Sequence, residues 1–207
     1  MSFFLNRIIL TVLAFSSISC VETVNSSLLK AVSLVAGEQE VIISAPNGFC
    51  VDQKQVSRVK GSIMLFVIDC IMNDNNGDIN AMRRPLSAIL TATVIDFQGS
   101  ELKSISRLEE LLTRKPGINF LSRTNTNAVL KVHHIENIEG LLFFLIEQRP
   151  SDIDVKQSNY FWRVFFIIDE KIISMTASNF SHGVASQKRL KRLINEFANS
   201  TLVANKR

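Results

Sequence analysis

The residues of this chain with the most distinctive chemistry are its three cysteines, whose thiols can be acylated, oxidised or used as nucleophiles. The first of them, Cys20, follows one positive charge at Arg7, an apolar run over residues 8–15 and a serine-rich stretch over residues 16–19. This is the layout of a secretory signal peptide, and the apolar run is too short to span a bilayer. We therefore expect residues 1–19 to be a signal peptide and the protein to be exported.

The four residues Ser17-Ile18-Ser19-Cys20 resemble the lipobox of bacterial lipoproteins, with Ser17 where a leucine is usual. The resemblance implies that Cys20 is lipidated, becomes the mature N-terminus and ties the protein to a membrane of the cell envelope. Residues 20–38 are then the lipid anchor and tether, and residues 39–207 form a single domain. Val21 after the cysteine is similar to the sorting pattern of outer-membrane lipoproteins, so we expect a periplasmic protein anchored in that membrane.

Cys50 and Cys70 remain as one pair once Cys20 carries lipid. An oxidising compartment would let these two thiols form a disulfide. Closing a loop of about twenty residues would stabilise the fold by roughly 3 kcal/mol in the chain-entropy model. The alternative is two buried free thiols. A catalytic cysteine is disfavoured, because no base is arranged beside either position and a bridged sulfur is no nucleophile.

Composition and charge restrict the class of protein. Without its first 19 residues the chain would keep 188 (207 minus 19), enough for one domain with a sizeable core. Hydrophobic residues make up 46% and charged residues 20% of the sequence, which is typical of a globular protein. The formal net charge is only +4, whereas nucleic-acid-binding proteins usually carry a dense stripe of Lys and Arg. We expect no nucleic-acid partner.

Motifs for catalysis and metal binding are missing from the sequence. It contains no Gly-x-Ser-x-Gly elbow, no glycine-rich phosphate loop and no His-Glu-x-x-His. Residues 73–78 are rich in Asp and Asn, but an aligned calcium loop would begin at Met72 and end at Arg83, without its anchoring carboxylates. His133 and His134 are neighbours on a predicted strand and should point to opposite faces. We expect no catalytic residue, no metal, no cofactor and no enzyme activity.

Two groups of cations are candidate binding residues. Arg163 interrupts an apolar predicted strand, where a charged side chain must find a partner or reach an edge. We expect a structural ion pair there, with a ligand contact as the alternative. The predicted C-terminal helix carries four cations off its apolar stripe, namely Lys188, Arg189, Lys191 and Arg192. We expect these to form a solvated face, with contact to anionic lipid headgroups as the alternative.

The remaining patterns predict the secondary structure. Runs of β-branched and aromatic residues predict strands at residues 40–45, 62–69, 86–97, 128–135, 140–147, 160–168 and 171–178. Helical spacing predicts a helix over 100–114, or from 107 behind Ser106, a second over 184–203, and a helical turn over 53–58 capped by Asp52. Residues 28–36 and 118–123 fit either a strand or a helix.

Two of these strands are apolar on both faces, which is typical of strands buried on both sides of a sheet. They are residues 62–69 and 160–168. The second should be central and should form a hairpin with 171–178 about Asp169-Glu170. The fold class expected from all of these patterns is α+β, a mainly antiparallel sheet covered by helices that include a C-terminal helix, with one disulfide.

Two motifs resemble segments of a family of uncharacterised exported proteins of alphaproteobacteria. They are Ala45-Pro46-x-Gly48-Phe49-Cys50-Val51-Asp52 and Phe161-Trp162-Arg163-Val164-Phe165-Phe166. The resemblance implies a partner for the first cysteine after the next strand, where Cys70 stands, and a closing terminal helix. The order of strands, hairpin and helix is also similar to the PsbP-like α/β sandwich, a fold of binding and assembly proteins.

These expectations favour a non-catalytic function. The first hypothesis is a lipid-anchored periplasmic interaction or assembly protein, with the membrane bound through Cys20 and an unknown envelope protein as its partner. The second is a small-ligand or lipid-binding envelope module, which requires a pocket lined by the aromatic residues of 143–166. A hydrolase of the envelope is the third and least favoured hypothesis.

Overall fold

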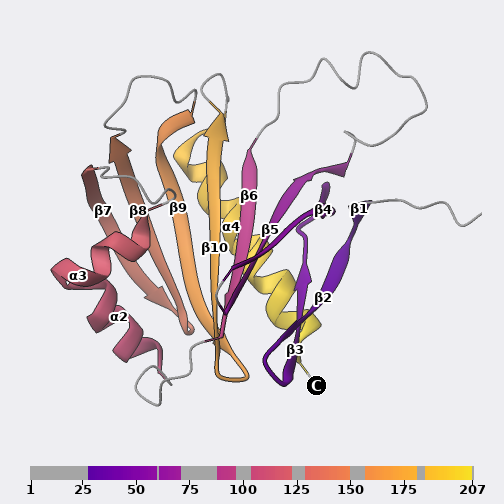
Figure 1. Cartoon of the computed structure of the whole chain (residues 1–207). Helices are drawn as coiled ribbons and strands as arrows, with labels where there is room; N and C mark the ends of the chain where they lie inside the picture. The colour runs from indigo at the N-terminus through magenta and orange to yellow at the C-terminus, as the bar shows by residue number, and fades with distance from the viewer. Residues whose placement is uncertain are drawn as a thin grey trace, which may run out of the picture.

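A computed structural model describes residues 28–59, 61–70, 88–96, 104–122, 129–149, 157–180 and 185–206. In this part of the chain, eight strands form one antiparallel sheet in the order β1-β4-β5-β6-β10-β9-β8-β7 (Figure 1). These strands are β1 (Leu28–Leu29), β4 (Phe49–Val59), β5 (Ser62–Asp69), β6 (Ile89–Ile95), β7 (Val129–Ile138), β8 (Leu141–Arg149), β9 (Gln157–Ile168) and β10 (Lys171–Phe180).

The other described elements pack on the two faces of this sheet (Figure 1). One face is covered by the C-terminal helix α4 (Gln187–Ala204) and a hairpin of β2 (Ala31–Ala36) and β3 (Gln39–Ser44). The opposite face receives α2 (Ile105–Thr113), which lies against β8 and β9. The short α3 (Lys115–Ile118) and the 3₁₀ turn η3 (Asn119–Leu121) follow α2 directly.

Alternation along the strands divides the apolar side chains between two cores. The larger core lies under α4 and the β2–β3 hairpin and includes Leu65, Val164 and Phe197. The smaller core lies under α2 and includes Leu108 and Phe144. Residues of β9 alternate between these two cores, which is why this strand is apolar on both faces. The predicted central position of β9 is confirmed, since it lies between β8 and β10.

The predicted hairpin about Asp169-Glu170 is also confirmed. Both residues have positive φ, 44° and 65°, as a two-residue turn of the primed type requires. A similar turn at Glu139-Gly140, with φ of 50° and 81°, joins β7 to β8. The strand ends therefore meet over two-residue turns, and from these turns the pairing runs without a shift as far as Ser178–Phe161 and His134–Leu145.

The C-terminal helix follows the predicted stripe. Ser186 caps its N-terminus by accepting a hydrogen bond from the backbone N–H of Arg189. Its buried face matches the apolar positions of the sequence, Leu190, Leu193, Ile194, Phe197 and Thr201, with Ala198 in addition. Helix α2 likewise begins behind Ser104, so the alternative start behind Ser106 is wrong.

The predicted helical turn over residues 53–58 is wrong, because these residues belong to the long strand β4. Ser57 pairs with Met64 on β5, and the ladder shifts register between Asp52 and Ser57. Asp52 does accept a hydrogen bond from the backbone N–H of Lys54, at 3.0 Å, but within this irregular strand. Pairing with β5 thus overrides the local capping signal. Residues 28–36, for which the sequence fits either a strand or a helix, contain strands β1 and β2.

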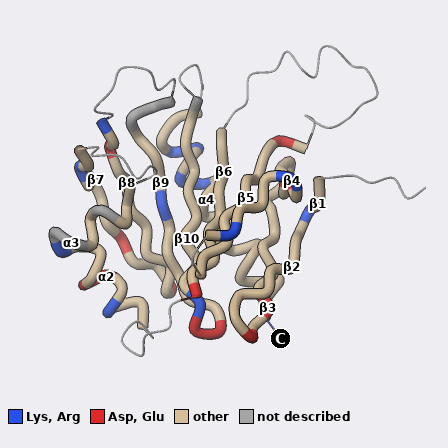
Figure 2. Tube along the Cα trace, in the orientation of Figure 1, with Lys and Arg blue, Asp and Glu red and all other residues tan. Residues whose placement is uncertain are grey.

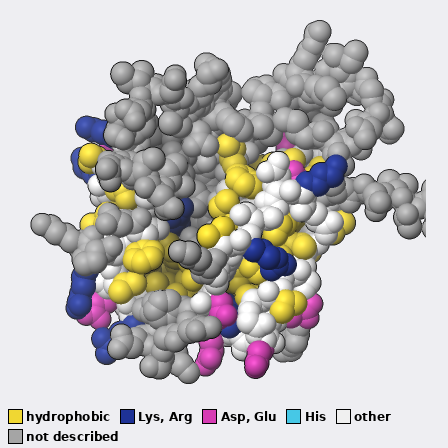
Figure 3. Space-filling model, viewed as in Figure 1, with side chains coloured by type: hydrophobic (Ala, Val, Ile, Leu, Met, Phe, Trp, Pro, Cys, Tyr) yellow, Lys and Arg dark blue, Asp and Glu magenta, His cyan; other side chains and the backbone are white. Residues whose placement is uncertain are grey.

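Two expectations about burial also need correction. Strand β5 alternates between buried and more exposed residues, so only one of its faces is fully buried. The sheet is also less covered by helices than the sequence predicts, since α2 reaches β8 and β9 and the β2–β3 hairpin shares the other face with α4. Hydrophobic side chains are visible on the face opposite α4 (Figure 3). No helix in the described ranges has both the length and the apolar character needed to cross a membrane.

Candidate functional site

The disulfide predicted from the sequence is present between Cys50 and Cys70. The two sulfurs lie 2.03 Å apart and the Cα atoms 5.0 Å apart. Cys50 stands near the start of β4 and Cys70 directly follows β5, so the bond closes the end of the β4–β5 hairpin. The backbone N–H of Cys70 also donates to the carbonyl of Gly48. The crosslink therefore fastens two neighbouring strands to each other.

Several other predicted positions lie outside the described residues. These are the signal peptide, the lipidation site Cys20 and the Asp- and Asn-rich loop 73–78. The predictions made for them are unchanged.

Arg163 lies in the middle of β9, on the same face as Phe161 and Phe165, which belong to the core under α2. Its guanidinium donates to the carbonyls of Phe120 and Ser122 at 2.9 and 3.2 Å, and to the hydroxyl of Thr176 at 3.0 Å. It also lies 5.6 Å from the ring centroid of Phe161. These contacts join the η3 segment to β9 and β10, so Arg163 has a structural role.

A β-bulge at His133 changes the expected position of the histidine pair. Val132 pairs with Ile146 and His134 with Leu145, so His133 is the extra residue of the ladder. The ring of His133 lies 5.4 Å from that of Tyr160, and the ring of His134 lies 6.1 Å from that of Trp162. Tyr160 and Trp162 are two residues apart on β9 and share a face. The expectation that the imidazoles point to opposite faces is therefore wrong.

Each of these histidines lies beside a glutamate. His133 Nε2 is 2.8 Å from Glu147 Oε2, and Arg149 Nε donates to the other oxygen of that carboxylate at 3.0 Å. Glu147 is buried, with 6% of the residue exposed. Hydrogen bonds from His133 and Arg149 lower the pKa of Glu147, outweighing the effect of burial, which raises it.

Helix α4 joins this group through Lys191. Its Nζ lies 2.5 Å from Glu136 Oε1 and 5.2 Å from the ring centroid of Trp162, while Glu136 Oε2 lies 3.4 Å from His134 Nε2. Burial raises the pKa of Glu136, but hydrogen bonds and attraction from Lys191 and His134 together lower it below its usual value. The indole N–H of Trp162 donates to the carbonyl of Gln187, which fixes the first turn of α4 on the sheet.

We call this group the polar cluster; its members are His133, His134, Glu136, Glu147, Arg149, Tyr160, Trp162 and Lys191. It ties the edge strand β7 to β8, β9 and the first turns of α4. Within the ranges that the structure describes, no three His, Cys, Asp or Glu residues are placed to hold a metal ion. The sequence prediction missed the polar cluster, because the bulge that brings the two histidines onto one face has no local sequence signal.

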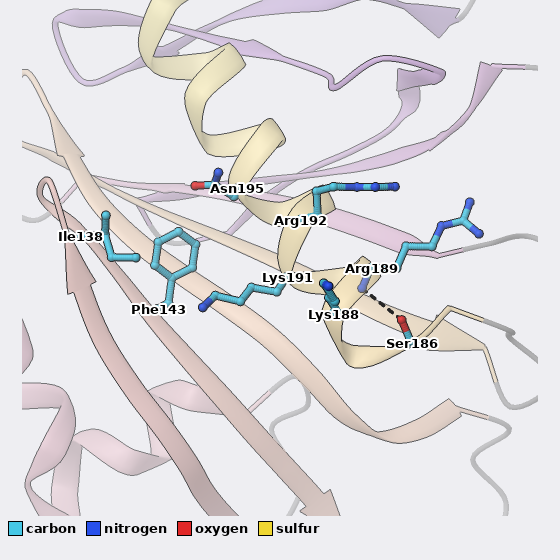
Figure 4. Close-up of a pocket in the computed structure, with 8 residues that line it drawn as sticks. All are labelled: Ile138, Phe143, Ser186, Lys188, Arg189, Lys191, Arg192 and Asn195. Atoms are coloured by element: carbon cyan, nitrogen blue, oxygen red, sulfur yellow. Dashed lines mark hydrogen bonds between the residues drawn. The ribbon is translucent and has the colours of Figure 1, made fainter.

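A groove borders the polar cluster on the flank of α4 (Figure 4). This α4 groove has a volume of about 560 Å³ and is lined by Ile138, Phe143, Ser186, Lys188, Arg189, Lys191, Arg192 and Asn195. Lys191 extends toward Phe143 and Ile138, whereas Arg189 and Arg192 extend from the other side of the helix (Figure 4). All four cations of the C-terminal helix therefore line one open groove with an apolar side.

The four cations differ in whether a carboxylate is paired with them. Lys191 is paired with Glu136, and Arg192 Nε lies 3.6 Å from Glu196 on the exposed side of the helix. Lys188 and Arg189 are exposed, and no carboxylate of the described segments lies within ion-pair distance of either. The groove can therefore accept an anion at Lys188 and Arg189, and its apolar side lies next to the paired Lys191.

Comparisons with known proteins assign no family to the chain. No protein-family model matches it, and no curated protein matches it. Among solved structures, it is similar to the extracellular domain of PknH from Mycobacterium tuberculosis, with a TM-score of 0.36 and 6% identity. This likeness covers 72% of this chain and 66% of that one, and it is too low to support an argument about fold or function.

Proposed function

We propose that the protein is a non-catalytic interaction or assembly protein of the cell envelope, exported to the periplasm and anchored through lipid on Cys20, with the outer membrane as its site. The observation that carries this proposal is the disulfide between Cys50 and Cys70. Structural disulfides are typical of oxidising compartments and rare in the cytosol. An exported location is also what the N-terminal sequence predicts.

The position of the first described strand is compatible with such an anchor. Eight peptide units separate Cys20 from Leu28, where β1 begins. A fully extended chain of this length reaches about 26–29 Å, so the domain would stay close to the bilayer surface. The proposal therefore places the folded domain beside the membrane, within reach of other envelope proteins.

Fractionation of cells that express the natural chain or the Cys20→Ser variant tests the anchor. We expect the natural protein in the membrane fraction and soluble only in detergent, because acyl chains on Cys20 partition into lipid. The variant should lose this detergent dependence, whereas a Ser57→Ala control, altered on exposed β4, should retain it. An identical distribution of natural chain and Cys20→Ser variant would contradict lipid anchoring.

Recovery of a partner tests the interaction role. Native purification from detergent-solubilised membranes should recover one envelope protein in a fixed ratio to this chain. Recovery of this chain alone, under conditions that preserve other envelope complexes, would contradict an assembly role.

The second candidate function is binding of a small ligand or a lipid, and the α4 groove favours it. The aromatic residues of 143–166 do not form the enclosed pocket that this hypothesis expected, because Phe143, Phe144, Phe161, Trp162, Phe165 and Phe166 are buried in the two cores. A ligand would instead lie in the open α4 groove, between its cations and Ile138.

A further inference from the structure

We infer that the α4 groove is a second membrane contact, which holds the basic end of the domain against the phosphate headgroups of an anionic bilayer. This inference deepens the proposed function, because it names the bilayer itself as the partner of the groove. Three observations carry it: the exposed cations, the exposed apolar side chain in the same groove, and the distribution of acidic residues.

The cations have chemistry suited to phosphate. Lys188 and Arg189 are exposed at the first turn of α4, and no carboxylate of the described part of the chain pairs with either. Arg192 is also exposed, with a side-chain exposure of 69%, and lies one turn further along. Guanidinium and ammonium groups bind phosphate oxygens, the first in a bidentate manner. Lys191 is already paired with Glu136 and serves to hold the helix in place.

The apolar side of the groove distinguishes it from an ordinary solvated helix face. Ile138 lies in the groove and is 48% exposed at the end of edge strand β7. Phe143 forms the adjacent wall. Exposed cations and an exposed apolar side chain in one groove are typical of surfaces that rest at the boundary between lipid headgroups and acyl chains. A small soluble anion would use only the cations.

The two ends of the domain differ in charge. The first turns of α4, which carry these cations, lie at the upper end of the domain in Figures 1 and 2. The opposite end carries acidic turns, with Glu38 between β2 and β3 and Asp169-Glu170 between β9 and β10. A negative bilayer attracts the first end and repels the second, so the charge distribution turns the cations of α4 toward the headgroups.

Chemical labelling of the purified full-length exported protein tests this contact. The protein is mixed with vesicles of phosphatidylcholine alone, or with about a third of phosphatidylglycerol added, and exposed to an amine-acylating reagent. Mass spectrometry of peptides then gives the labelling rate of Lys188. We expect this rate to fall several-fold on the anionic vesicles only. Lys206, exposed at the far end of α4, is the internal control and should keep its rate.

Variants make the test specific to the groove. Arg189→Gln should raise the anionic lipid concentration needed to protect Lys188 by about fivefold, the effect of one cation at a bilayer surface. Lys206→Gln should leave that concentration unchanged. Both positions are exposed, and an unchanged thermal transition checks that each variant folds.

Three results would overturn the inference. They are equal labelling of Lys188 on both kinds of vesicle, equal protection by inorganic phosphate alone, and equal protection by a polyglutamate peptide. The last two would assign the groove to a soluble anion or an acidic protein. The mass of the same sample reports whether Cys20 carries acyl chains, so loss of the anchor and loss of the groove contact are separate outcomes.

Discussion

Glu147 and Glu136 connect the polar cluster to stability at low pH. Both carboxylates have a pKa lowered from the usual 4.5. A group whose pKa is lower in the folded than in the unfolded chain stabilises the fold above the unfolded pKa and loses that contribution as the pH falls through the folded pKa. The polar cluster should therefore weaken on acidification below about pH 4.5, when the carboxylates begin to bind protons in the unfolded chain.

The first prediction concerns Glu147→Gln. This variant should be less stable than the natural protein at neutral pH, because His133 and Arg149 lose their charged partner. The difference should shrink as the pH falls below about 4.5, since the natural carboxyl is then also neutral in the unfolded state. Urea denaturation at several pH values measures it. The matched control is Glu139→Gln, an exposed residue of the β7–β8 turn. Parallel curves for Glu147→Gln and the natural protein would contradict this role.

Helix α4 is fastened to the β2–β3 hairpin by polar side chains near its C-terminus. Asn205 accepts a hydrogen bond from the backbone N–H of Ile42 at 3.0 Å and donates to the carbonyl of the same residue at 2.7 Å. Thr201, one turn earlier, accepts a hydrogen bond from the backbone N–H of Ser44 at 3.2 Å. These side chains satisfy backbone groups of β3 in the way that a neighbouring strand would.

The second prediction concerns Asn205→Ala. It leaves the N–H and carbonyl of Ile42 without these partners and should lower the free energy of unfolding by about 1–3 kcal/mol. Chemical denaturation measures the change. Lys206→Ala, at the next and exposed position, should shift stability by no more than about 0.5 kcal/mol. Equal effects of the two variants would show that the contact with β3 contributes nothing.

The turn of the β2–β3 hairpin packs against an ion pair of the main sheet. Lys171 Nζ lies 2.6 Å from Asp96 Oδ1, with both side chains largely buried. A Cβ atom added to Gly37 would come within 2.8 Å of the other oxygen of Asp96. Gly37 also has a φ of +64°, which disfavours any side chain. The hairpin can approach β6 and β10 because this position has no side chain.

The third prediction compares Gly37→Ala with Gly48→Ala. Gly48 has a φ of +82° but open space around its added Cβ. Gly48→Ala should therefore cost only the backbone strain, about 1–2 kcal/mol. Gly37→Ala should cost more, because it also displaces Asp96 from Lys171. Thermal or urea unfolding of the two variants gives the comparison, and an equal loss of stability would contradict the close packing at Gly37.

The elements best predicted from the sequence are those with long, regular patterns. The β9–β10 hairpin is predictable because two apolar runs flank a short turn. Helix α4 is predictable because its apolar residues recur at helical spacing and form one buried face. Strand β4 is not, since its mostly polar residues 53–58 belong to a strand that pairs with β5 on both sides of a register shift, at Asp52 and at Ser57. The bulge at His133 is equally unpredictable from the sequence, because it depends on how β7 and β8 align. The polar cluster, which depends on that bulge, is therefore visible only in the structure.

For the molecule as a whole, the disulfide limits the freedom of the unfolded chain. It closes a loop with a sequence separation of 20 residues. The fourth prediction is that the double variant Cys50→Ser/Cys70→Ser loses about 3 kcal/mol of unfolding free energy, by the chain-entropy model. Denaturation with and without reductant measures the loss. The reduced natural protein should match the double variant, and stability unaffected by reductant would contradict a structural disulfide.

The arrangement of charge also acts on the whole domain. Cations on the first turns of α4 at one end and acidic turns at the other would orient the domain on an anionic surface.

The central claim, that the domain is exported and tied to a bilayer through Cys20, is tested most directly by the intact mass of the protein extracted from membranes without reductant. The account predicts a chain that begins at Cys20, carries the added mass of fatty acyl chains and lacks the two hydrogens removed by the Cys50–Cys70 bond. A chain that still begins at Met1, has no acyl mass and retains three free thiols would contradict it.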